Sequence, residues 1–140
     1  MFYRTQDGHN LSRDPFNAIV VPRPIGWISS VDKNGIVNLA PYSFFNAVAY
    51  SPPQVMFAAT GGHSQGGKKD SIQNAEGTGE FVVNLATWDL REQMNASAVP
   101  APSEINEFAY CGLTESPSEL VKPPRVAESP VHLECIYTQT

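Results

Sequence analysis

An Asn-Gly pair between two apolar runs is the feature that most constrains how this chain can fold. It lies in the tetrapeptide Asp32-Lys33-Asn34-Gly35, and both residue types tolerate the positive φ angles that a tight hairpin turn requires. The flanking runs, 25–31 and 36–40, are rich in β-branched residues, which favour strands. We therefore predict an antiparallel hairpin whose second strand ends at Pro41, because proline cannot donate to a strand ladder.

Other apolar runs, separated by glycine and proline, predict more short strands and two short helices. Several short strands with minor helices are typical of a barrel or a sandwich, so we expect one mainly β domain. The expected strands are 16–21, 54–59, 80–85 and 131–137. The expected helices are one that starts at an Asp70 N-cap and stops at Gly77 and Gly79, and one over 89–98. Elsewhere in the chain we expect an aromatic turn or short helical segment at 42–48, a glycine-rich loop at 60–67 and a proline-rich surface strap at 116–130.

Composition limits the classes of partner. Hydrophobic residues make up 41% of the 140 residues and charged residues 16%, which favours a single soluble globule. The net charge of −5 argues against nucleic acid, since that partner needs a basic surface. No apolar run is long enough to span a bilayer, and residues 1–10 do not resemble a secretory signal. We expect a cytoplasmic protein with no nucleic-acid or membrane partner.

The cysteines and histidines predict no metal site and no catalytic cluster. Cys111 and Cys135 lie far apart and outside any CxxC pattern, so we expect two packed, reduced thiols. His9, His63 and His132 show no metal-ligand spacing. We expect His9 and His63 to be solvated loop residues and His132 to lie on a strand face.

One polar tetrapeptide, Lys68-Lys69-Asp70-Ser71, could hold a phosphate. It places cations, a hydroxyl and unpaired backbone N–H groups at the start of a helix, which suits an anion. The alternative is a solvated, capped helix end, and for the tetrapeptide taken alone that alternative is favoured.

A second cluster joins Arg23–Ser30 to Asn38–Asn46 across the predicted hairpin. It places flat and polar groups at one corner of a sheet, where a planar heteroaromatic ligand could find an apolar slot edged by donors. The alternative is that Trp27, Phe44 and Phe45 are simply core residues. For each aromatic taken singly, the core alternative is favoured.

Together and in this order, the two clusters resemble the flavin reductase-like family, whose fold is an FMN-binding split β-barrel of Greek-key type. The similarity runs from about residue 14 to residue 135. Its carriers are Arg23–Ser30, Asn38–Asn46, Ser51-Pro52-Pro53 and Lys69-Asp70-Ser71 with Asn74, with weaker agreement at 81–84, 128–130 and 133–135. We accordingly predict an irregular segment over 1–13 and a split-barrel domain over 14–140. Similar proteins usually continue further, so we expect that domain to be truncated at its C-terminal end.

The resemblance implies an FMN site, with the phosphate near Lys69 and Ser71. It also implies a homodimer. The residues to which it assigns contact with FMN are Trp27, Ile28, Ser29, Ser30, Ala40, Pro41, Tyr42, Ser43, Asn46, Lys69, Asp70 and Ser71.

The implied activity is NAD(P)H-dependent reduction of FMN by hydride transfer, with the flavin supplying the chemistry and no catalytic side chain. The reduced flavin would pass to a partner oxygenase or another electron acceptor. Two alternatives stay open, a non-enzymatic FMN-binding electron carrier of flavoredoxin type and a barrel fragment that functions only within a dimer.

Overall fold

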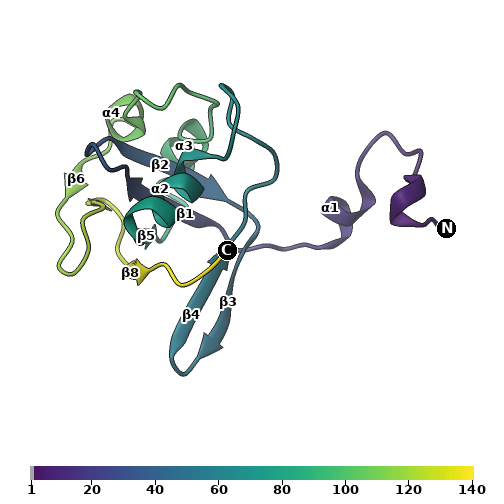
Figure 1. Ribbon diagram of the computed structural model, residues 1–140, viewed down its shortest axis with the longest axis horizontal. Helices are drawn as coiled ribbons and strands as arrows, with labels where there is room; N and C mark the ends of the chain where they lie inside the picture. The colour runs from purple at the N-terminus through teal and green to yellow at the C-terminus, as the bar shows by residue number, and fades with distance from the viewer. Residues whose placement is uncertain (1) are drawn as a thin grey trace.

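The computed structural model describes residues 2–140 (Figure 1). Its main unit is a four-stranded antiparallel sheet with strand order β2-β1-β5-β8, and two further strand pairs, β3–β4 and β6–β7, form separate small sheets. The strands are β1 (Gly26–Val31), β2 (Val37–Tyr42), β3 (Phe45–Tyr50), β4 (Pro53–Phe57), β5 (Glu80–Asn84), β6 (Glu115–Ser116), β7 (Arg125–Val126) and β8 (His132–Ile136). The helices are the 3-10 turn η1 (Thr5–Asp7), α1 (Pro15–Ile19), α2 (Asp70–Thr78), α3 (Arg91–Ala96) and α4 (Glu107–Cys111).

Strand β1 is buried along its whole length because both faces of the sheet are covered. Successive side chains of a strand point to opposite faces, so Trp27 packs in one apolar cluster with Phe108 of α4, and Ile28 packs in another with Ala75 of α2 and Phe81. Figure 1 shows α2 lying across the sheet, with α3 and α4 at its upper end. The core therefore consists of two clusters separated by β1 and its neighbours.

The predicted β1–β2 hairpin is confirmed. The Asp32 carboxylate accepts hydrogen bonds from the N–H groups of Asn34, at 2.8 Å, and Ile36, at 2.7 Å, and Gly35 has a φ of +88°. The prediction that Pro41 ends the second strand is wrong, because β2 continues to Tyr42. β2 is an edge strand, and Leu39, two residues earlier, turns its N–H away from β1. The nitrogen of Pro41 faces the same way, so no ladder hydrogen bond is lost.

The expected turn or helical segment at 42–48 is instead mostly strand β3, which pairs with β4 in a hairpin that projects from the body (Figure 1). Packing of its first residue explains why. The ring of Phe45 lies against the backbone of Gly26, where a Cβ would come within 2.5 Å of the ring, and it contacts the core cluster that contains Ile28. The absence of a side chain at Gly26 thus allows β3 to begin close to β1.

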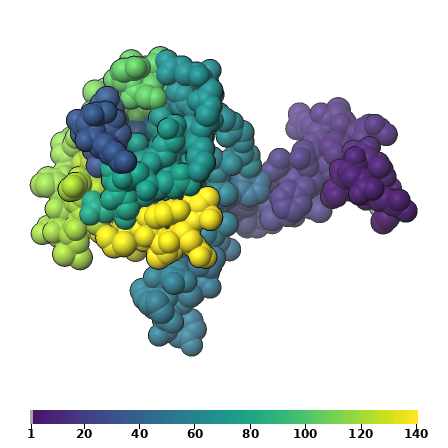
Figure 2. Space-filling view, in the orientation of Figure 1, coloured from purple at the N-terminus to yellow at the C-terminus, as the bar shows by residue number. Residues whose placement is uncertain are grey.

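The expected strand at 16–21 is wrong, since this segment contains helix α1. Asp14 caps the helix, its carboxylate accepting from the N–H groups of Phe16 at 2.8 Å and Asn17 at 3.4 Å, and Pro15 occupies the first turn. A capping aspartate followed by proline is a strong helix start, which here overrides the β propensity of Ile19 and the valines after it. Figure 2 shows this N-terminal arm extending away from the main body.

Two details of the helices differ from expectation. Lys69, not Asp70, is the N-cap residue of α2, and the helix continues through Gly77 to a left-handed Gly79. Helix α4 was not predicted, although Asn106 caps it by accepting from the N–H groups of Phe108 and Ala109. The strands expected at 54–59, 80–85 and 131–137 and the helix within 89–98 are confirmed to within a few residues. Within residues 2–140, none of the helices has the length and apolar character needed to cross a membrane.

Candidate functional site

The two serines of β1 are buried and hydrogen bonded inside the protein. Ser29 donates to the carbonyl oxygen of Pro124 at 2.5 Å and accepts from the side-chain amide of Asn84 at 3.1 Å. Ser30 accepts from the side-chain amide of Asn74 at 3.1 Å. Both serines are 0% exposed. Their hydroxyls therefore join β1 to its neighbours and do not face solvent.

Trp27 and Ser71 are interior residues as well. The indole N–H of Trp27 donates to the hydroxyl of Ser97 at 2.9 Å, and the whole residue is 0% exposed. The hydroxyl of Ser71, also 0% exposed, accepts from the side-chain amide of Asn38 at 2.8 Å. Trp27 therefore lies in the core, with its polar edge bonded to the protein.

Two adjoining hollows lie where the end of β2 meets the start of α2. Tyr42, Ser43, Thr60 and Lys69 line the first, the cationic hollow, of about 200 Å³. Tyr42, His63, Asp70 and Glu107 line the second, the acidic hollow, of about 100 Å³. Pro41, Tyr42 and Lys69 border both, so the hollows share a wall, and together they are called the groove.

The cationic hollow carries donors suited to an anion. The ammonium of Lys69 has no ion pair or hydrogen bond among the described residues, whereas the neighbouring Lys68 binds Glu76 at 2.6 Å. The Nε of Arg23 donates to the hydroxyl of Ser43 at 3.4 Å, and the guanidinium lies 5.1 Å from the ring centre of Phe44. Because the oxygen of Ser43 accepts from Arg23, its hydroxyl hydrogen stays free to donate. A charged amine beside hydroxyl donors is a donor set that fits a phosphate.

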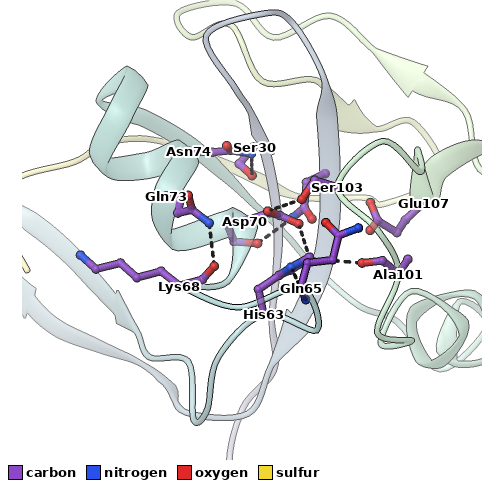
Figure 3. A network of polar contacts seen from close by, with 12 residues as sticks. Ser30, His63, Gln65, Lys68, Asp70, Gln73, Asn74, Ala101, Ser103 and Glu107 are labelled. Atoms are coloured by element: carbon purple, nitrogen blue, oxygen red, sulfur yellow. Dashed lines mark hydrogen bonds and ion pairs between the residues drawn. The ribbon is translucent and has the colours of Figure 1, made fainter.

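In the acidic hollow, a buried histidine connects three segments (Figure 3). The Nε2 of His63 lies 3.2 Å from Asp70 Oδ2 and 3.2 Å from the carbonyl oxygen of Ala101, and its Nδ1 accepts from the N–H of Gln65 at 3.1 Å. With Nδ1 facing the N–H of Gln65, Nε2 is the ring nitrogen that faces Asp70 and Ala101. The side chain of His63 is 7% exposed. The expectation that His63 is a solvated loop residue is therefore wrong.

Glu107 is a second residue of this groove, besides His63, that the sequence did not indicate. It is 6% exposed, and its Oε2 accepts from the N–H of Leu39 at 2.9 Å, which satisfies a backbone donor on the open edge of β2. Burial raises the pKa of the Glu107 carboxyl, and burial likewise raises the pKa of the Tyr42 hydroxyl. An acid directly after the capping residue Asn106 was the available signal, because both are typical of a helix start.

The predicted contact residues fall into three groups. Ala40, Pro41, Tyr42, Ser43, Lys69 and Asp70 line the groove. Trp27, Ile28, Ser29, Ser30 and Ser71 lie in the interior. Asn46 is exposed on β3, where its side chain accepts from the N–H of Ala47. The contact of each with FMN stays a prediction, and the structure brings together only the first group.

Residues that could transform a ligand are sparse. Cys111 and Cys135 are free and partly buried, as predicted, and burial raises the pKa of Cys135 to about 11, so its thiol is not a ready nucleophile. Within the part of the chain that the structure describes, no three histidine, cysteine, aspartate or glutamate side chains are placed to share a metal ion.

Comparison with known proteins identifies the family. The model of the flavin reductase like domain matches residues 18–140. A protein of Aquifex aeolicus (strain VF5) is 44% identical over 117 residues, which cover 84% of this chain and 59% of the relative. The chain belongs to the flavin reductase-like domain family. It spans little more than half the length of that relative.

Solved structures agree with the fold of this flavin reductase-like chain. Component B of nitrilotriacetate monooxygenase from Bacillus cereus superposes with a TM-score of 0.84 at 30% identity, over 97% of this chain and 67% of that one. The 2-nitrobenzoate 2-nitroreductase of Pseudomonas fluorescens gives a TM-score of 0.81 at 26% identity, over 97% of this chain and 64% of that one. The predicted family and the mainly β split-barrel fold with short helices are confirmed.

Proposed function

We propose that this chain binds FMN along the groove and that it is an NAD(P)H-dependent flavin reductase. The phosphate would occupy the cationic hollow, and the rest of the flavin would extend past Tyr42 towards the acidic hollow. Membership of the flavin reductase-like family supports a flavin as the ligand. The position of Lys69 supports the proposed orientation of the flavin, with its phosphate in the cationic hollow.

The observation that carries the proposal is the position of Lys69. Lys69 borders both hollows and its ammonium is not paired with a described residue, while Lys68, one residue earlier, is paired with Glu76. Hydroxyl groups of Ser43 and Thr60 line the same hollow. A free amine with neighbouring hydroxyls favours a phosphate monoester over a neutral group.

The size of the groove is compatible with this ligand. Small-molecule sites usually enclose roughly 300 to 1,000 Å³, and the two hollows together reach the lower end of that range. Bound FMN would supply the redox chemistry, accepting a hydride equivalent from NAD(P)H. The residues of the chain then bind and orient the flavin, which agrees with the scarcity of nucleophiles in the groove.

Two further proposals concern partners. The similar structure from Bacillus cereus is a component of a monooxygenase, which supports transfer of reduced flavin from this protein to an oxygenase. Edge strand β8 exposes Leu133 and Ile136, and an open strand edge with apolar side chains favours pairing with a second copy. We therefore also propose a homodimer.

Titration with FMN and riboflavin tests the proposed function. We expect FMN to bind more tightly than riboflavin, measured by flavin fluorescence, and the complex to oxidise NADH or NADPH faster than free FMN does. Equal affinity for the two flavins would contradict the phosphate site. Tight FMN binding without oxidation above the free-flavin rate would indicate the electron carrier instead of the reductase.

A further inference from the structure

Two uncharged elements project from the body of the protein. They are the N-terminal arm, residues 2–22 with helix α1, and the hairpin of β3 and β4 (Figures 1 and 2). Neither 15–22 of the arm nor 45–57 of the hairpin contains an aspartate, glutamate, lysine or arginine, although 16% of the chain is charged. Exposed strands usually carry charges that prevent pairing, and the cores of protein interfaces are depleted of charge. The composition of both elements is therefore typical of surfaces that become covered in an assembly.

Both elements also expose large hydrophobic side chains. Four lie in the arm and three in the hairpin, and their exposed fractions run from 42% to 94%: Phe16, Ile19, Val20, Val21, Val48, Tyr50 and Met56. A side chain of this size that is about half exposed presents roughly 100 Å² to solvent. Together these side chains approach the area of about 800 Å² that each partner buries in a stable interface.

Helix α1 is not supported by the body of its own chain. It has five residues, Pro15–Ile19, and none of them is buried. A helix of this length is not stable in water without packing. The apolar side of α1 therefore needs a surface that its own chain does not supply.

The base of the arm is nevertheless fixed. Arg23 Nη1 donates to the carbonyl oxygens of Val20, at 2.6 Å, and Asn17, at 3.1 Å. The ring of Phe16 lies parallel to that of Phe44, with their centres 6.4 Å apart, and Phe44 directly precedes the hairpin. Because α1 is held there, the arm leaves the body in a defined direction, which lowers the entropy cost of an association.

A pocket beside the hairpin can receive apolar side chains. It has a volume of about 220 Å³ and is lined by Val48 and Met56 of the hairpin, Ile72 of α2 and Ile136 of β8, among others. An apolar cavity of roughly 150 Å³ takes up benzene, so this pocket has room for a phenylalanine ring or an isoleucine side chain. Since Ile136 belongs to the open edge strand, the pocket is continuous with the surface proposed above for pairing.

We propose that the N-terminal arm is exchanged between two copies of this chain. The apolar side of α1 in each copy packs on the β3–β4 hairpin of the other copy and reaches the pocket beside it. The inference rests on the proposed homodimer and names the segments that form it. A second copy is the occupant because one chain carries both the uncharged arm and the uncharged hairpin with its pocket, and two-fold symmetry forms the same contact twice.

The first test uses Ile19→Asp, with dimerisation measured by sedimentation equilibrium. Ile19 is 74% exposed and lies outside the groove, so the variant should fold like the parent. Its dimer should dissociate about tenfold more readily or worse, because a carboxylate would be buried among apolar side chains. Leu120→Asp is the matched control. Leu120 is 84% exposed between β6 and β7 and does not line the pocket, so this variant should dimerise like the parent.

The second test mixes Ile19→Asp with Val48→Asp. Each variant alone has a charge in both contacts of its dimer, one in the arms and the other in the hairpins. In a mixed dimer one intact arm meets one intact hairpin, so the mixture should form more dimer than either variant does alone.

The outcomes separate this inference from the homodimer on which it rests. A monomeric parent would overturn both. A dimeric parent with an equally stable Ile19→Asp dimer would overturn the exchange of arms and leave the edge of β8 as the contact. No gain of dimer on mixing would likewise overturn the exchange, since the arm and the hairpin would then not meet.

Discussion

Strand β1 and the groove beside it contain similar polar residues used in opposite ways. The hydroxyls of Ser29 and Ser30 are fully buried and bonded to the protein. The ammonium of Lys69 and the hydroxyl of Ser43 border a hollow, and each keeps donors that no described residue takes. Both regions belong to the segments that resemble the family.

The difference shows that a family signature combines two kinds of residue. Polar groups inside β1 hold the sheet to the segments that cover it, so changing them should alter stability. Lys69 and Ser43 at the groove contribute little to packing, so changing them should alter ligand binding more than stability. Each prediction below tests whether a residue belongs to the first kind or the second.

The largest effect is expected for Trp27→Ala. Trp27 is 0% exposed, packs against Leu39 and Phe108, and donates to Ser97. Removing a buried indole leaves a large cavity, so the free energy of unfolding should fall by about 3–5 kcal/mol in denaturant titration. Ser43→Ala, at the groove, should change it by less than about 0.5 kcal/mol. A stable Trp27→Ala that has lost only flavin binding would place Trp27 in the site instead.

The next largest effect is expected for Asn84→Ala. The Asn84 amide donates to the carbonyl oxygen of Trp27 and to Ser29, and its oxygen accepts from the N–H of Val126 at 2.8 Å. Loss of this side chain leaves several buried groups unpaired, at about 1–3 kcal/mol each, so unfolding free energy should fall by about 2–4 kcal/mol. Asn46→Ala, on exposed β3, is the control and should be close to neutral. Similar stability of the two variants would show that the β1 hydroxyls find other partners.

The sequence predicted the sheet well where local chemistry and tertiary packing agree. The β1–β2 hairpin follows from Asn34-Gly35, and Asp32 reinforces that turn. The prediction from the sequence failed where one local signal competed with another. In α1 the Asp14 cap overrides the β-branched residues, and in β2 the outward-facing nitrogen makes Pro41 harmless.

The groove was predicted only in part, because its lining comes from segments distant in sequence. Lys69 and Tyr42 could be named from the resemblance, since each lies within a matching motif. Glu107 and His63 could not, because nothing local indicates that a loop residue and a helix residue meet beside Asp70. Burial of the β1 serines also depends on partners such as Pro124, which is 95 residues from Ser29.

The two adjacent lysines give a sharp test on the groove side of the comparison. Lys69→Ala should weaken FMN binding by about 1.5–3 kcal/mol, because a charge-assisted phosphate contact is lost, and should leave riboflavin binding nearly unchanged. Lys68→Ala removes the same charge one residue away, but Lys68 is engaged with Glu76, so its effect on FMN should be much smaller. Isothermal titration calorimetry with both flavins measures each value. Equal losses in the two variants would mean that general positive charge, not the position of Lys69, attracts the phosphate.

The smallest expected effect concerns pH and compares two glutamates. Burial raises the pKa of Glu107 above the ordinary value of 4.5, so the folded state retains its proton longer than the unfolded state does. The parent should therefore lose stability as pH rises above about 4.5, and Glu107→Gln should become more stable relative to the parent over that range.

Glu134 behaves in the opposite way. The N–H groups of Glu119 and Leu120 lower the pKa of Glu134, so the stability that this carboxylate contributes is present above pH 4.5 and is lost as pH falls. Glu134→Gln should therefore become less stable relative to the parent as pH rises towards 4.5. Urea titrations from pH 3 to pH 8 measure the unfolding free energy of each variant relative to the parent. This difference should rise with pH for Glu107→Gln and fall with pH for Glu134→Gln, and a change of the same sign in both would show that burial does not raise the pKa of Glu107.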